Sequence, residues 1–188
     1  MIKDIVTANR SYRRFQHEVS IDMDTLKELI ELARLSASGG NRQPLKYMLS
    51  CDEEKNALIY SKLAWAAYFK DWAGPVEAER PSAYVILLGD TEISKSFAYD
   101  CGIAAQSILL GAVEKGLGGC MLASVDRDGL RSALGIAGRY EIPLVIALGK
   151  PVERVVLETV GPDDDVKYWR DKEGVHHVPK RPLADIII

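Results

Sequence analysis

Apolar positions along the chain switch between helical and extended spacing, which predicts helices interleaved with strands. From Asp22 to Ala37 the apolar residues recur every three or four positions, as on one face of an amphipathic helix. Residues 83–88 and 142–148 are continuous apolar runs closed by glycine, which favours buried strands. Weaker signals predict a helix over 3–9, a strand over 46–51, a helix over 94–115, a strand or tight loop over 118–124 and a helix over 126–134. Together they predict an α+β or α/β fold in which helices cover a mixed sheet.

Two segments give no single prediction. Residues 52–80 have helical composition as far as Asp71, but a Gly74-Pro75 pair then breaks the pattern. The tail beyond Gly161 is polar and interrupted by proline until residues 183–188. The last three residues are isoleucines, which are apolar enough to form a final strand, added to the sheet of another chain.

Two glycines lie inside the predicted long helix. Gly102 and Gly111 each cost up to ~1 kcal/mol relative to alanine at such positions. Close approach of another helix would offset this cost, and a second subunit could supply that helix.

Composition adds the size and the charge of the chain. With 188 residues, 47% of them hydrophobic, we expect one domain over residues 1–188 with a full core. The net charge of −3, from 24 basic and 27 acidic side chains, argues against disorder and against general binding to nucleic acid. No apolar run is long enough to cross a bilayer. The polar start and three widely spaced cysteines lead us to expect a cytoplasmic protein without disulfides.

A basic segment near the N-terminus is the first candidate for binding chemistry. Arg10, Arg13 and Arg14 surround Ser11 within five residues. Guanidiniums match the geometry of phosphate, and a serine hydroxyl adds a further donor. The alternative is a solvated basic turn, which the local sequence by itself favours.

The second candidate segment follows the amphipathic helix and spans Ser36 to Pro44. Its glycines and serines expose backbone groups, while Asn41 and Gln43 can each donate and accept hydrogen bonds at once. That combination suits the edge of a planar heteroaromatic ring. An ordinary turn from helix to strand is the alternative, although such a turn needs the glycines but not both amides.

Nothing in the chain indicates acid–base, nucleophilic or metal chemistry of its own. His176 and His177 are adjacent and form no metal-ligand pattern with distant His17. The glycines at 116–119 follow a helix and lack the last glycine of a dinucleotide-binding fingerprint. We expect no metal, and because no side chain is placed to do such work unaided, a cofactor would have to carry the chemistry.

Taken together, these motifs resemble those of the nitroreductase family of FMN-dependent oxidoreductases. The resemblance covers nearly the whole chain, and the order of the motifs matches. They are Arg10-Ser11-x-Arg13-x-Phe15, then Ser38-x-x-Asn41-x-Gln43-Pro44, then Gly116 to Gly119 after the long helix, then the strand exit from Pro143 to Pro151, and finally Pro179-Lys180-Arg181.

The resemblance implies an α+β homodimer, with a mainly antiparallel sheet covered by helices and two FMN sites at the subunit interface. It implies four groups of cofactor-binding residues. Arg10, Ser11 and Arg13 would hold the phosphate and ribityl chain, with Lys180 and Arg181 approaching the same phosphate; Ser38, Gly39, Asn41 and Gln43 would line the isoalloxazine from the partner subunit; Met121, Leu122, Ala123 and Ser124 would present a backbone amide to the flavin N5 and O4 edge.

Some positions depart from the family pattern. Asn9 stands where a further arginine is common, and Leu45 replaces the usual tryptophan after Gln-Pro. Residues 52–80 match no substrate-covering helix. The aromatic residues there are candidates either for the substrate pocket or for the core and dimer interface: Trp65, Tyr68, Phe69 and Trp72.

The activity implied by the resemblance is transfer of hydride from NADH or NADPH to FMN, followed by reduction of a small-molecule acceptor such as a nitroaromatic or a quinone. The same scaffold also permits oxidase or dehalogenase chemistry. Two other classes stay open: a non-catalytic flavin-binding protein, and an anion- or nucleotide-binding module that uses the arginines at 10–14.

Overall fold

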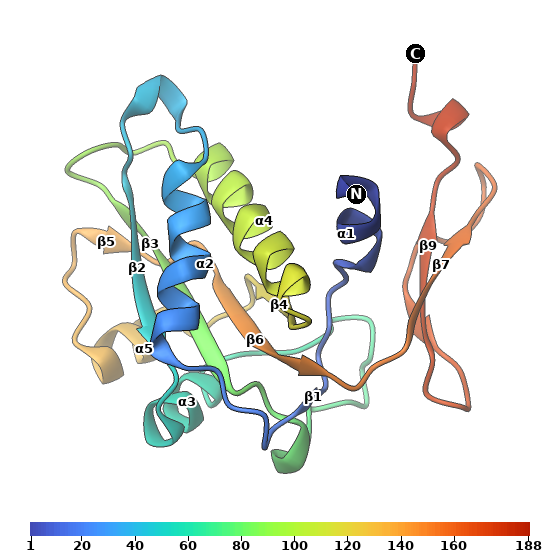
Figure 1. Ribbon diagram of the computed structural model, residues 1–188, viewed down its shortest axis with the longest axis horizontal. Coiled ribbons are helices and arrows are strands. Elements are labelled where there is room, and N and C mark those ends of the chain that lie inside the picture. The colour runs from blue at the N-terminus through green and yellow to red at the C-terminus, as the bar shows by residue number, and fades with distance from the viewer.

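The computed structural model describes residues 1–188 and contains two separate sheets (Figure 1). A six-stranded sheet carries the core and comprises β1 (Phe15–Gln16), β2 (Leu45–Ser50), β3 (Ala83–Asp90), β4 (Gly118–Leu122), β5 (Tyr140–Glu141) and β6 (Val145–Pro151). Five α-helices accompany it: α1 (Ile2–Ala8), α2 (Met23–Leu35), α3 (Glu53–Tyr60), α4 (Ala98–Glu114) and α5 (Arg127–Leu134). The tail forms a three-stranded sheet of β7 (Val155–Thr159), β8 (Trp169–Arg170) and β9 (His176–Lys180).

The two central strands of the larger sheet are β3 and β6, which run antiparallel. β2 pairs with the other side of β3, and β4 pairs with β6, both antiparallel. The short β1 continues along the end of β6, where Phe15 lies opposite Pro151. In the tail, β7 and β9 are parallel, whereas β8 and β9 are antiparallel. The fold is therefore α+β with a mainly antiparallel sheet, as predicted.

Side chains alternate along β3 between two cores, one on each face of the sheet. Val85 and Leu87 belong to the core under α2 and α4, while Tyr84 and Ile86 belong to the core that contains α3 and α5 residues. All eight residues of β3 are buried, because helices cover both faces. This agrees with the continuous apolar run in its sequence and differs from the alternating pattern of a half-exposed strand.

The α2–α4 contact explains one of the helix glycines. A side chain at Gly111 would overlap Leu32 of α2, so glycine allows the two helices to pack closely. Gly102 faces away from this contact and has no neighbour within 4 Å of the position of a Cβ atom. The prediction of a close helix partner is confirmed at Gly111, within the same chain.

Several predicted boundaries shift. The long helix begins at Ala98 instead of residue 94, and the strand expected from residue 142 begins at Val145. Only α3 forms between residues 52 and 80, followed by turns and the 3-10 helix η2 (Glu77–Glu79). The 3-10 helix η1 (Gly39–Asn41) lies in the turn after α2.

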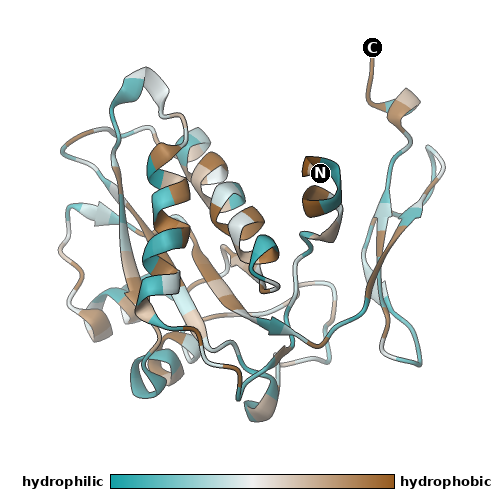
Figure 2. Ribbon diagram, in the orientation of Figure 1, coloured by the Kyte–Doolittle hydropathy of each residue, from teal (hydrophilic) through white to brown (hydrophobic).

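The end of the chain carries the 3-10 helix η3 (Leu183–Asp185), and residues 186–188 form no strand within this chain. Figure 2 shows this terminus as an apolar segment that projects away from the main sheet. Ile186 and Ile187 are 61% and 66% exposed. Helix α1 stands between α4 and the tail sheet (Figure 1). No helix has the length and apolarity that crossing a membrane requires.

Candidate functional site

The segment after α1 runs alongside β4, and this places the N-terminal arginines next to the central sheet. The backbone N–H of Tyr12 donates to the carbonyl of Gly119 at 3.0 Å, and Ser11 forms a parallel bridge with Gly119. Gly118 has no side chain, and a Cβ atom there would come within 2.6 Å of the Tyr12 ring. The glycines that follow α4 therefore serve close packing of backbone and rings.

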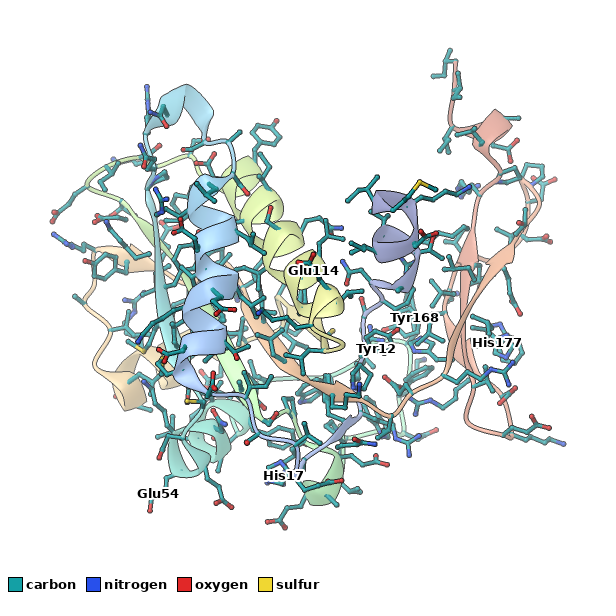
Figure 3. The ribbon with its side chains drawn as sticks, in the orientation of Figure 1. Tyr12, His17, Glu54, Glu114, Tyr168 and His177 are labelled. Atoms are coloured by element: carbon teal, nitrogen blue, oxygen red, sulfur yellow. The ribbon has the colours of Figure 1, made fainter.

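A cavity of about 300 Å³ opens between this segment, α4, β4 and the tail. It brings together five of the residues predicted to bind the cofactor: Arg10, Ser11, Arg13, Met121 and Lys180. They come from three distant parts of the chain, namely the N-terminal segment, the end of the central sheet and the last tail strand. Figure 3 shows Tyr12 and Tyr168 near each other below helix α1, with Tyr168 on the side of the tail sheet.

The two cavity arginines have unused hydrogen-bonding capacity. Arg10 Nη2 donates to the carbonyl of Val6 at 2.7 Å, while its buried Nε has no partner. Arg13 is 8% exposed, donates through Nη1 to the carbonyl of Ser11 at 3.2 Å, and also has a buried Nε without a partner. Burial lowers the pKa of Arg10, because water solvates the charge of its guanidinium less fully. An anion in the cavity would pair with the positive charge of both guanidiniums.

A buried carboxylate holds this arginine segment in place. Glu153 is fully buried, and its Oε2 accepts from the backbone N–H of Arg13 at 2.5 Å and of Arg14 at 3.3 Å. Its Oε1 accepts from Arg170 Nη2 of β8 at 2.6 Å. Glu153 thus connects the N-terminal segment to the tail sheet. Sequence reasoning missed it, because a single glutamate after a strand carries no signal of its own.

Other cavity residues were also missed by the sequence analysis. They are Gln106, Leu109, Tyr168, His176 and Val178, while Asn9, noted above as a departure from the family pattern, lines the cavity as well. His176 is 1% exposed, and neither ring nitrogen has a hydrogen-bond partner. Burial, together with the nearby guanidiniums of Arg13 and Arg170, lowers the pKa of His176 to about 4, so the ring is neutral at pH 7. The adjacent histidines at 176 and 177 were noted in the sequence only as a rejected metal motif.

The tail places the two predicted cations differently. Lys180, at the end of β9, lines the cavity. The guanidinium of Arg181 instead donates to the carbonyl of Pro162 at 3.3 Å, and Arg181 does not line the cavity.

The stretch from Met121 to Ser124 leaves β4 at its end. Met121 is 37% exposed, whereas Leu122 is buried in the second core. The carbonyl of Ala123 accepts from Arg127 Nη2 at 3.0 Å, and that of Ser124 from the backbone N–H of Ala64 at 2.9 Å. These two bonds fix the carbonyls of the loop.

The second predicted cluster lies in the turn after α2, next to the first turn of α4. The hydroxyl of Ser38 donates to Asp100 Oδ2 at 2.5 Å, and the backbone N–H of Gly39 donates to Asp100 Oδ1 at 3.0 Å. Asn41 and Gln43 have positive φ angles of 51° and 52°, which cost energy for residues other than glycine. Such strain is typical of functional loops.

The two clusters lie on opposite sides of α4. Asp100 contacts the turn after α2, and Leu109, nine residues further along α4, lines the cavity. Nine residues make about two and a half helical turns, so the two positions point in opposite directions. One chain therefore does not bring both predicted clusters to a single site.

The aromatic candidates of residues 65–72 do not line this cavity. Trp65 is buried in the second core, and Trp72 packs against it. Phe69 lies behind the cavity wall, with its ring centroid 5.2 Å from Tyr168 and 5.7 Å from His176. Within the chain, Trp65 and Trp72 therefore act as core residues.

Comparison with known proteins agrees with the fold and the motifs. The family model described as Nitroreductase family matches residues 6–150, which is more than half of the chain, so the protein belongs to the nitroreductase family. A relative from Archaeoglobus fulgidus, named "Putative NADH dehydrogenase/NAD(P)H nitroreductase", is 27% identical over 155 residues, covering 78% of this chain and 83% of the relative.

Two solved structures illustrate the shared fold. A nitroreductase family protein from Streptococcus pneumoniae TIGR4 aligns with a TM-score of 0.70 at 18% identity, over 100% of this chain and 99% of the other. A Clostridium difficile R20291 protein named FMN-dependent nitroreductase aligns with a TM-score of 0.65 at 20% identity, over 90% of this chain and 92% of the other.

Proposed function

We propose that this protein is an FMN-dependent oxidoreductase that takes hydride from NADH or NADPH and reduces small acceptors such as nitroaromatics or quinones. The observation that carries the proposal is the cavity in which Arg10, Arg13 and Lys180 meet, in a chain that belongs to the nitroreductase family. The names of its relatives, which include an NAD(P)H nitroreductase and an FMN-dependent nitroreductase, support the same activity.

The cavity residues fit the phosphate end of FMN. A phosphate monoester carries close to two negative charges at neutral pH and three strong acceptor oxygens. Arg10 and Arg13 each hold a buried N–H without a partner. None of the acidic side chains of the chain forms an ion pair with Arg10, Arg13 or Lys180. These three cations would bind the phosphate, with the hydroxyl of Ser11 beside it.

The protein supplies binding and orientation, because no side chain of the site is arranged as an acid, base or nucleophile. The chemistry that FMN would supply when held by these residues is acceptance of hydride and transfer of electrons, which the side chains lack. The backbone from Met121 to Ser124 would lie at the reactive edge of the ring. An N–H donor there favours the reduced ring, which gains electron density at that edge. The ring of His176 is neutral at pH 7 and adds no further positive charge beside the arginines.

A homodimer would complete the site. Ser38, Gly39, Asn41 and Gln43 lie on the opposite side of α4 from the cavity, so they would reach the flavin bound by a partner subunit. Gly102 and the 40%-exposed Ile103 form part of an uncovered face of α4, suited to a helix of that partner. The exposed terminal isoleucines and the free edge of β2 offer a further contact between subunits.

The surface area of the chain also favours a dimer. The isolated chain exposes 10723 Å², whereas a compact 20.8 kDa monomer exposes about 8,900 Å². The excess, about 1,800 Å², is more than the roughly 800 Å² per partner that a stable interface buries.

The absorption spectrum of the purified protein tests the proposal. We expect a yellow protein that releases FMN on denaturation and whose flavin is bleached by NADH or NADPH without oxygen. Arg10→Ala should lose FMN, while Arg34→Ala, which removes an exposed arginine of α2 paired with Glu31, should retain it. A colourless protein that takes up no added FMN would contradict the proposal. A flavin that stays oxidised under excess NADH and NADPH would instead indicate a non-catalytic flavoprotein.

A further inference from the structure

The turn after α2 has an unusual backbone. Gly40, Asn41 and Gln43 all have positive φ angles, of 56°, 51° and 52°. Left-handed conformation costs roughly 1–2 kcal/mol for each residue that carries a Cβ atom. The turn therefore needs contacts that hold it in this shape.

Asp100 provides those contacts from α4. This carboxylate is 7% exposed and lies in the first turn of the helix, where the helix dipole favours negative charge. Its two oxygens accept separately, from the hydroxyl of Ser38 at 2.5 Å and from the backbone N–H of Gly39 at 3.0 Å. The Ser38 oxygen in turn accepts from the backbone N–H of Gln43 at 2.9 Å.

These bonds form a chain with a fixed direction. An ionised carboxylate can only accept, so the hydroxyl hydrogen of Ser38 points toward Asp100 and an oxygen lone pair of Ser38 is left for Gln43. Both ends of the turn, Gly39 and Gln43, are thereby tied to one buried group. The hydroxyl hydrogen of Ser38 is therefore engaged within the turn, and the second lone pair of its oxygen stays free.

The tether leaves two polar groups free at the tip of the turn. Gln43 Nε2 donates to Asn41 Oδ1 at 3.2 Å and to the Asn41 carbonyl at 3.3 Å. Asn41 Nδ2 and Gln43 Oε1 have no partner in the chain, and both residues are exposed. A donor and an acceptor are thus held side by side, which matches the alternating carbonyl and N–H groups at the edge of a flavin pyrimidine ring.

We infer that Asp100 is a positioning residue for the flavin site: through Ser38 and Gly39 it holds the strained turn that presents Asn41 and Gln43 to the isoalloxazine. The inference rests on the proposed function, because the ligand of the turn is the FMN of the proposed dimer. Asp100 itself would touch neither the flavin nor the substrate.

Asp100→Ala, Ser38→Ala and the double variant test the tether, with Asp128→Ala as the matched control. Asp128 is likewise in the first turn of a helix, but it is exposed and contacts no part of the site. In the protein stripped of FMN, hydrogen–deuterium exchange of the Gly39 amide should become at least ten-fold faster in Asp100→Ala, and that of the Gln43 amide at least ten-fold faster in Ser38→Ala.

With FMN present, loss of a hydrogen bond to a charged group predicts a roughly ten- to hundred-fold weaker FMN affinity for Asp100→Ala. The visible circular dichroism of the bound flavin should change as well, because the ring sits differently. The double variant should be no worse than Asp100→Ala, because both residues act through one chain of bonds. Asp128→Ala should match the wild type in every measurement. Ser38→Ala keeps the test decisive if Asp100→Ala folds poorly, since Ser38 is only half-buried.

The outcomes separate the inference from the proposed function. A wild-type protein that binds FMN, together with an Asp100→Ala variant of unchanged affinity and dichroism, overturns the inference alone. Independent, additive losses in the double variant also overturn it. A wild-type protein that binds no FMN overturns the proposed function, and the inference falls with it.

Discussion

Removal of Glu153 tests whether one buried carboxylate holds the N-terminal segment against the tail. In Glu153→Ala three donors lose their acceptor: the backbone N–H groups of Arg13 and Arg14, and the guanidinium of Arg170. The carboxylate is fully buried and Arg170 is 19% exposed, so the arginine is left charged with little access to water.

The size of the effect follows from this burial. Breaking a buried ion pair by removing one partner costs about 3–5 kcal/mol of unfolding free energy. For a chain of this length each kcal/mol lowers the melting temperature by about 2–4 °C, so Glu153→Ala should lower it by about 6–20 °C. Glu79→Ala is the matched control, because Glu79 pairs with Arg14 in a partly exposed ion pair. Such a pair contributes about 0–1 kcal/mol, which predicts a shift of no more than about 4 °C.

Thermal unfolding by circular dichroism and urea titration would measure both variants. A double-mutant cycle with Arg170→Ala adds a second check: the double variant should lose less stability than the sum of the single changes, because no charge is then left buried without a partner. The reasoning is refuted if Glu153→Ala unfolds within 2 °C of Glu79→Ala, or if the two single changes are additive.

Three further predictions concern the tail and strand β4. Hydrogen bonding to Glu158, together with that to Asp171, raises the pKa of His177 above 6.5, so the stability that its charge adds to the tail sheet should be full below pH 6.5 and be lost as the pH rises through the raised value. Amide exchange of β9 between pH 5 and 9 measures this loss. A His177→Gln variant that keeps the same pH dependence would count against it. Gly119→Ala should lower the free energy of urea unfolding by about 1–3 kcal/mol, because a Cβ atom there overlaps the Ala147 carbonyl. Gly138→Ala, with open space around it, should lower it far less. Equal effects of the two changes would show that the structure around Gly119 can relax. Lys180→Ala should weaken FMN binding roughly ten-fold or more in a fluorescence titration, while Arg181→Ala should have a smaller effect, since only Lys180 lines the cavity. A larger loss of affinity in Arg181→Ala than in Lys180→Ala would assign the phosphate contact to Arg181 instead.

Local patterns predicted the elements whose signals lie within a few residues of each other. Asp22 and Asp126 cap α2 and α5 by accepting from the backbone N–H groups of Thr25 and Gly129. β3 follows its uninterrupted apolar run and extends two residues further, through Gly89 and Asp90. In these cases the side chains that decide the structure are neighbours in the sequence.

Boundary errors arose where side chains competed with the regular pattern. The hydroxyl of Ser94 donates to the carbonyl of Ser96 at 2.9 Å and accepts from the backbone N–H of Ser96 at 3.2 Å. Because these bonds form a local loop, α4 begins only after it. Pro143 has no N–H for a strand ladder, which explains why β6 begins at Val145. Both boundaries were predicted from the positions of apolar residues, and that pattern does not register the effects of Ser94 and Pro143.

The tail sheet and the Glu153 contacts could not be predicted from local patterns. β7 and β9 are parallel strands separated by a loop and β8, and their pairing depends on contacts between residues about 20 positions apart. Glu153 bonds an N–H group 140 residues away. Five of the residues that the family resemblance implies for cofactor binding nevertheless line one cavity, because motif order keeps information about contacts that periodicity lacks.

The charges of the site show why the net charge of the chain is a poor guide to the charge of its cavity. Five of the basic residues near the two ends of the chain fall into two groups. Arg14 and Arg170 are neutralised by Glu79 and Glu153, and these pairs build the scaffold between the N-terminal segment and the tail. Arg10, Arg13 and Lys180 line the cavity, where no carboxylate pairs with them. At physiological salt, charges farther apart than about 8 Å are largely screened, so an anion responds to these three cations and not to the total of −3. The carboxylates that hold the scaffold are therefore what allows a mildly acidic chain to keep a concentrated positive charge in one cavity.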